Sequence, residues 1–167
     1  TAKIDEHVNR ADFICISHSH FNHCMDMPYI AKKTNAAVIG TESTTNIARA
    51  CGVPEHKLIT VRGGEDYELG AISIKVISSL HSALMIPSPR SALENCRYFD
   101  SGVVPRDVKS PLRLSDYVEG GALGYFVRFG EHRILALCSM NYIEREMVGL
   151  RPTAALLPAA HWRTEVY

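Results

Sequence analysis

The stretch FICISHSHFNHCMD, residues 13–26, joins a run of apolar residues directly to three closely spaced histidines. Residues 13–17 form a short, almost continuously apolar run, which predicts a buried β-strand. His18, His20 and His23 follow at spacings of two and three, a cluster that packing alone seldom explains. Because neutral imidazole is a good ligand for zinc, the stretch predicts a metal site where a strand ends.

Two later strands are also predicted to run into a histidine. Residues 71–81 end on His81, and residues 154–161 end on His161. In sheet folds the strand ends and the loops after them carry functional sites. If the three strands are neighbours, their histidines converge at one rim with His18 and His20. His161 has the alternative of packing or capping a helix that begins near Trp162, and His7, His56 and His132 are interpreted as surface residues.

The remaining pattern alternates strands and helices, which predicts an α/β fold. Helices are expected at 25–34, 43–52 and 143–150, strands at 36–40 and 57–61, and a hairpin at 122–139 around the turn at 130–132. Asp26 would lie in the first turn of its helix, and Ser43 or Thr44 would cap the next. The 167 residues are expected to form a single domain, in which the proline-rich segment 82–120 is a long loop over the site.

The composition argues against nucleic-acid-binding, membrane-spanning and disulfide-stabilised proteins. Lysine plus arginine equals aspartate plus glutamate at 18 each, so the formal charge is zero and no nucleic-acid partner is expected. No apolar run approaches 18 residues, so no membrane span is expected, and no signal peptide is visible. The five irregularly spaced cysteines argue against a disulfide framework and favour a reducing, cytoplasmic location.

The run SHSHFNH, residues 17–23, resembles the H-x-H-x-D-H signature of the metallo-β-lactamase fold. The order of the later features is similar too: His81 at a strand end, the hairpin at 121–139, and the strand at 154–161. Within that superfamily the chain looks most like the lactonase-like and phosphodiesterase-like branch that includes ascorbate-6-phosphate lactonase. The resemblance implies an αββα sandwich with the metal site at one edge. It also implies that the family's first strands are missing and that the chain is a core fragment.

The resemblance assigns roles to individual residues. His18, His20 and His81 match the first metal site, and His23 with position 22 matches the second. Asn22 stands where the family has aspartate, and Ser139 falls near the family's bridging aspartate. Both anionic ligands of the family are therefore replaced by neutral side chains.

The two replacements predict a single metal ion. Two divalent ions about 3.5–4 Å apart repel each other by about 20 kcal/mol at an effective dielectric constant of about 20. Without carboxylates to offset this repulsion, we expect one ion, Zn²⁺ or else Mn²⁺ or Fe²⁺, on His18, His20 and His81. The Asn22 amide cannot accept a proton at neutral pH. Asp26, one helical turn away, is a candidate substitute; its alternative role is that of a first-turn acid.

These residues favour a metal-dependent hydrolase that uses a zinc-bound hydroxide on an ester, lactone or phosphodiester. A degenerate, non-catalytic binding module of the same fold is the alternative, and a nuclease ranks third because basic stretches are absent. The expected partner is a small-molecule substrate of anionic character, and a homo-oligomer stays open. Cys24 and Cys138 are secondary ligand candidates. Arg90, Arg97 and Arg106 either bind an anionic group or are solvated loop charges.

Overall fold

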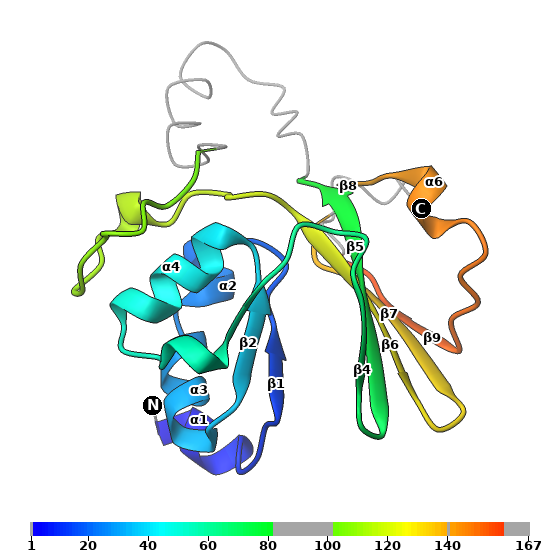
Figure 1. Cartoon of the computed structure of the whole chain (residues 1–167), viewed down its shortest axis with the longest axis horizontal. Helices are drawn as coiled ribbons and strands as arrows, with labels where there is room; N and C mark the ends of the chain where they lie inside the picture. Colours follow the sequence, from blue (N-terminus) through cyan, green and yellow to red (C-terminus); the bar gives the residue numbers. More distant parts are fainter. Residues whose placement is uncertain (1, 82–101, 140, 159–167) are drawn as a thin grey trace. The chain divides into compact units, whose positions relative to one another are not determined.

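The computed structural model describes residues 2–81, 102–139 and 141–158 (Figure 1). The predictions made for Arg90, Arg97, His161 and Trp162 lie outside these residues. The chain divides into two compact units. Unit 1 holds the described residues 2–61 and 102–120, and unit 2 holds 62–81, 121–139 and 141–158.

Unit 1 is built on a parallel three-stranded sheet. Its strands are β1 (Phe13–Cys15), β2 (Ala37–Gly40) and β3 (Leu58–Thr60), in the order β1-β2-β3. Parallel neighbours require a crossover connection, and helices supply it here. α2 (Phe21–Cys24) and α3 (Met27–Thr34) lie between β1 and β2 in the chain, and α4 (Glu42–Ala50) lies between β2 and β3. Figure 1 shows α3 and α4 beside β1 and β2.

The first residues of α3 and α4 differ from those expected from the sequence. α3 begins at Met27 with Asp26 as its N-cap, so Asp26 precedes the first turn instead of lying in it. α4 is capped by Thr41, whose side chain accepts a hydrogen bond from the Thr44 amide; the prediction that Ser43 or Thr44 caps this helix was wrong. Unit 1 also contains α1 (Ala2–His7) and two 3-10 turns, η1 (Glu55–Lys57) and η3 (Leu114–Asp116).

The core of unit 1 lies between the sheet and its helices. Its buried members come from β2, the helices, their flanking residues and the 102–120 segment: Ile16, Cys24, Met27, Ala31, Val38, Ile47, Ala48, Val53 and Val104. Burying such side chains contributes roughly 1.5–3 kcal/mol for each large aliphatic residue. Because Val104 belongs to this core, the described part of the proline-rich segment is an integral part of unit 1.

Unit 2 is a mainly antiparallel sheet in the order β4-β5-β6-β7-β9. β4 (Asp66–Leu69), β5 (Ile72–Leu80), β6 (Leu123–Phe129) and β7 (His132–Leu137) pair as successive antiparallel neighbours. β9 (Ala154–Leu156) adds to β7 in parallel, and β8 (Asn141–Tyr142) pairs with the end of β5. Ile77, Phe126, Leu135 and Leu137 form a buried cluster. The short helix α6 (Glu144–Met147) follows β8.

The strands and helices of both units confirm the α/β class, and the hairpin of β6 and β7 confirms the expectation for 122–139. The condition set for convergence, that the strands before His18 and His81 are neighbours in one sheet, is not met, because β1 belongs to the three-stranded sheet and β5 to the other. β4 was not predicted from the sequence: residues 66–69, which follow the strand expected at 57–61, pair with β5. His132 is the first residue of β7, not part of the turn.

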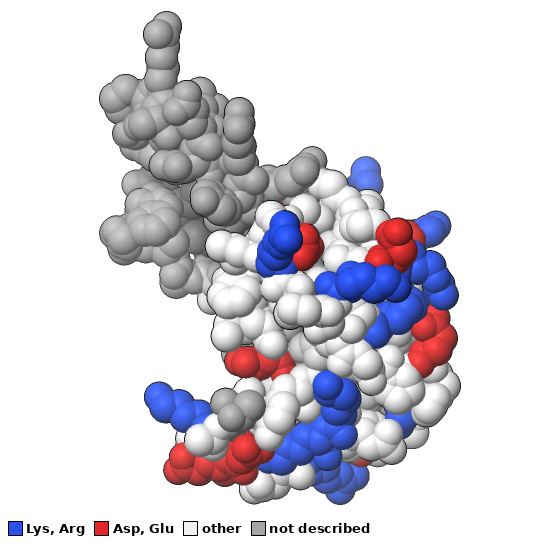
Figure 2. All heavy atoms as spheres, turned by 90° about the vertical axis from the view of Figure 1, so that its left-hand side faces the viewer, with Lys and Arg blue, Asp and Glu red and all other residues white. Residues whose placement is uncertain are grey.

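Charged side chains of both signs and four cysteines lie among the described residues. On the face shown in Figure 2, basic and acidic side chains lie side by side, and its described residues form no stripe of one sign. The cysteines within the described ranges, Cys15, Cys24, Cys51 and Cys138, form no disulfide. In those same ranges, no helix combines the length and apolar character needed to cross a bilayer.

Candidate metal centre

The histidine cluster of unit 1 lies on a bend between β1 and α2. His18, Ser19 and His20 belong to no helix or strand, and α2 begins at the next residue. His18 is 2% exposed and His20 is 4% exposed. Histidine is of intermediate burial in proteins, so two histidines that are almost fully buried need hydrogen-bond partners or a ligand for their ring nitrogens. Their burial on a short irregular stretch makes them the candidate ligands of the described part of unit 1.

The imidazole rings of the cluster lie close together. The ring centroids of His18 and His20 are 4.8 Å apart, and those of His18 and His23 are 4.0 Å apart. The ligand nitrogens of His18 and His20 lie within 4.8 Å of each other. Neutral imidazole nitrogens converging in this way are a donor set suited to Zn²⁺ and other divalent transition metals.

Ser17 orients the first of these rings. Its hydroxyl lies 3.0 Å from Nδ1 of His18, in a buried contact between neighbouring residues. In the tautomer whose Nδ1–H donates to the Ser17 hydroxyl, the lone pair on Nε2 is available to a metal. Partners that fix the tautomer and orientation of a histidine ligand are a regular part of metal sites. The residues present therefore fit a metal ion in both donor chemistry and ring support.

The neighbouring candidates differ in exposure. Asn22 on α2 and Asp26 ahead of α3 are exposed, and the Asp26 side chain makes no capping hydrogen bond. Cys24 is buried, and its thiol donates to the carbonyl oxygen of His18 at 3.7 Å. Burial raises the pKa of the Cys24 thiol to about 12. Because the thiolate is the ligand form, this environment favours the packing role of Cys24.

The candidates of unit 2 gather at one edge of its sheet. β5 and β7 are both antiparallel to β6, so their C-terminal ends lie at the same edge. His81 follows β5 directly, and the buried Ser139 follows β7 by two residues. Asn141, which the sequence analysis did not single out, is bound there: its carbonyl accepts from the Ser79 hydroxyl at 3.1 Å, and its side-chain amide donates to the His81 carbonyl at 3.5 Å.

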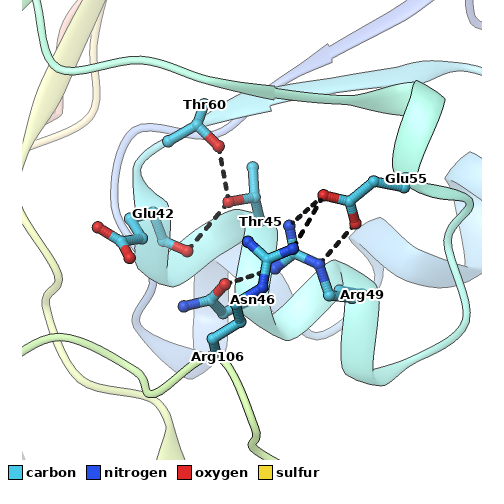
Figure 3. A network of polar contacts seen from close by, with 7 residues as sticks. All are labelled: Glu42, Thr45, Asn46, Arg49, Glu55, Thr60 and Arg106. Carbon is cyan, nitrogen blue, oxygen red and sulfur yellow. Dashed lines mark hydrogen bonds and ion pairs between the residues drawn. The ribbon is translucent and has the colours of Figure 1, made fainter.

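Arg106 is the only one of the three arginine candidates among the described residues. It contacts Glu55 with 3.5 Å between Nη2 and Oε1, and its side chain is 72% exposed. Figure 3 shows it beside Arg49, which binds the same carboxylate. This partnership favours the role of a solvated charge for Arg106.

Similar sequences exist among curated proteins, although no family model matches the chain. A UPF0173 metal-dependent hydrolase of Flavobacterium johnsoniae is 28% identical over 82 residues, which are 49% of this chain and 35% of that protein. A UPF0173 metal-dependent hydrolase of Staphylococcus aureus strain JH9 is 32% identical over 75 residues, 44% of this chain and 32% of that protein. The matching part of the chain thus spans about a third of the length of these relatives.

Solved structures similar to the chain include the Rm3 metallo-β-lactamase, with a TM-score of 0.48, 13% identity, and coverage of 90% of this chain and 49% of that one. Igni18, a metallo hydrolase of the archaeon Ignicoccus hospitalis, has a TM-score of 0.44 and 14% identity over 75% of this chain and 40% of its own. Over about half of its length, then, the chain is similar in sequence to proteins named metal-dependent hydrolases, the class that residues 16–26 predict.

Proposed function

We propose that the chain is part of a metal-dependent hydrolase of the metallo-β-lactamase fold. The observation that carries this proposal is the pair of buried histidines, His18 and His20, on the bend after β1. The ligand nitrogens of these two imidazoles lie within 4.8 Å of each other, an arrangement that suits a metal ion better than the packing of a hydrophobic core. The names of the curated relatives support the same class.

His81 is proposed as the third ligand of the same ion. It stands directly after β5, in the position that the order of the family's histidines gives to the next ligand. His23 is proposed as part of a weaker second site, together with Asn22. Because Asn22 and Ser139 are neutral, we propose one tightly held ion per chain, with zinc as the metal suited to three imidazoles. His161 stays a predicted ligand.

The reaction class proposed is hydrolysis of an ester, lactone or phosphodiester. A bound divalent ion supplies a Lewis acid and lowers the pKa of a coordinated water to about 7. The chain's own residues would orient a metal ligand and accept a proton. Ser17 is proposed to fix the ring of His18, and the exposed carboxylate of Asp26 is the proposed proton acceptor, a role that the Asn22 amide cannot take. An anionic small molecule is the proposed substrate, and a cytoplasmic location stays a prediction.

A non-catalytic binding module is the second candidate. It is favoured by the neutral side chains at Asn22 and Ser139, the two positions where the family carries carboxylates. The two candidates differ in turnover, not in fold, because both retain the buried histidines. Hydrolysis of generic chromogenic esters and phosphodiesters by metal-loaded protein separates them.

Elemental analysis of protein purified without added metal tests the metal site itself. We expect about one zinc or similar ion per chain, since three neutral imidazoles suffice for one site. His20→Ala should abolish the bound metal, whereas His56→Ala, which changes an exposed histidine of η1 in the same unit, should leave it unchanged. Full metal content in His20→Ala, or none in the unchanged protein even after titration, would refute the proposal.

A further inference from the structure

The bend that carries His18 and His20 is held by hydrogen bonds to a segment about 100 residues further along the chain. Ser19, the residue between them, is fully buried. Its backbone N–H donates to the carbonyl of Glu119 at 2.9 Å, and its hydroxyl donates to the carbonyl of Val118 at 2.5 Å, with Glu119 at 3.1 Å. Both donors of Ser19 are therefore used to tie the histidine bend to residues 118–119.

Residues 102–120, here called the strap, are themselves anchored on α4. The amide of Val104 donates to the hydroxyl of Ser43 at 2.9 Å, and the side-chain amide of Asn46 donates to the Val104 carbonyl at 2.7 Å. Val104 is 1% exposed, so these bonds are made in the core of unit 1. The strap is thus bound to α4 at one end and to the histidine bend at the other.

Gly120 shows how closely the strap approaches the bend. Its φ of +66° lies in the left-handed region that favours glycine, and a Cβ built there would overlap Ser43 and the hydroxyl of Ser19. α4, the strap and the histidine bend therefore meet at a point that has no room for a side chain. Such a contact restricts how far Ser19 can move.

We infer that Ser19 is a positioning residue for the metal ligands: it holds the backbone between His18 and His20 against the strap, so that both imidazoles are oriented before a metal binds. This inference rests on the proposed function, because a positioning role presupposes that His18 and His20 bind a metal ion. Hydrogen-bonded partners behind the ligands typically change metal affinity by about 10–100-fold when they are removed. Ser19 differs from Ser17 in its hydrogen-bond partners, which are backbone carbonyls of the strap and not an imidazole nitrogen.

The test is a competition titration of Zn²⁺ against a chromophoric chelator, using the full chain, with Ser19→Ala compared with the unchanged protein. Thr45→Val is the matched control, because Thr45 is also buried in unit 1 and its hydroxyl donates to the Glu42 carbonyl at 3.0 Å, away from the strap. The absorption spectrum of bound Co²⁺ reports the ligand geometry in each variant. Ser43→Ala, which loosens the other end of the strap, serves as a second variant.

We expect Ser19→Ala to bind Zn²⁺ about tenfold or more weakly and to change the Co²⁺ spectrum, with a smaller loss in Ser43→Ala and none in Thr45→Val. Unchanged affinity in Ser19→Ala, or equal losses in Ser19→Ala and Thr45→Val, overturns the positioning role but leaves the metal site standing. If Ser19→Ala does not fold, unchanged affinity and an unchanged spectrum in Ser43→Ala overturn it. Absence of binding by the unchanged protein would overturn the proposed function as well.

Discussion

Asn46 is the residue whose replacement should most weaken the attachment of the strap to unit 1. Its side chain is 2% exposed and makes two hydrogen bonds: the amide donates to the Val104 carbonyl at 2.7 Å, and the oxygen accepts from Arg49 at 2.5 Å (Figure 3). Asn46→Ala removes both partners at once. The buried carbonyl of Val104 then loses its side-chain partner.

The magnitude follows from three effects. Leaving a buried carbonyl without its partner costs about 1–3 kcal/mol. The lost bond to Arg49 adds about 0.5–1 kcal/mol, a small value because Arg49 is partly exposed and keeps its bonds to Glu55. Alanine is the better helix former in α4 and returns about 0.5–0.7 kcal/mol. The free energy of unfolding should therefore fall by about 2 kcal/mol, a large part of the about 5–15 kcal/mol typical of a domain.

Urea unfolding followed by far-UV circular dichroism measures this change. For a slope of about 2 kcal/mol per molar urea, the midpoint should fall by about 1 M. Hydrogen exchange should accelerate at residues 102–108, since the Val104 amide is held at the same point. Glu55→Gln is the control: it removes the exposed ion pairs with Arg49 and Arg106 and leaves Asn46 intact, so its effect should be smaller and should weaken further with salt. A midpoint for Asn46→Ala equal to that of Glu55→Gln would refute the reasoning.

Two further predictions concern charge. Asn22→Asp should raise the metal content above one ion per chain by supplying an anionic ligand, with stability changed by less than about 0.5 kcal/mol because Asn22 is exposed; unchanged content in elemental analysis would mean that position 22 does not reach the site. Burial acts to raise the pKa of Glu65, but hydrogen bonds from the backbone amides of Arg62 and Gly63 outweigh it, so the pKa lies below its ordinary value of 4.5. Its contribution to stability is therefore present above pH 4.5 and is lost as the pH falls through the lowered pKa. Glu65→Gln should flatten the acid-side fall of the unfolding free energy in urea titrations, and an unchanged slope would contradict the assignment.

Local sequence patterns predicted the elements that local physics determines. The apolar runs at 13–17 and 36–40 became β1 and β2. β2 is buried at three of its four residues, whereas β1 lies at the edge of its sheet and is half-buried, so the expectation of a buried strand was wrong for Phe13–Cys15. The hairpin of β6 and β7 followed from two strand patterns separated by a short glycine-containing turn. β4 was missed because its two charged residues, Asp66 and Glu68, leave only two apolar residues in a short segment; they occupy the exposed positions of an alternating edge strand, while Tyr67 and Leu69 are half-buried.

The histidine cluster could be predicted because spacing is a local property, but sheet membership could not. The sequence left open whether the strands before His18 and His81 are neighbours; in the structure, β1 and β5 pair with different partners in different sheets. Pairing depends on contacts between distant residues, which no window of sequence contains. For the same reason, the proline-rich segment was predicted only as a loop over the site, whereas its described part supplies Val104 to the core of unit 1.

Ser19 shows where a local argument ends and a long-range one must begin. Residues 18–20 belong to no helix or strand, so no periodicity of the sequence indicates the direction of the Ser19 side chain. What that side chain meets lies 99 residues further along the chain, at Val118, and the only local sign of the contact is a glycine at position 120. The role of Ser19 and the need for glycine at position 120 become visible only in the fold, which brings Ser19, Gly120 and Ser43 together. The metal affinity of Ser19→Ala measures whether that contact serves the imidazoles or only the fold.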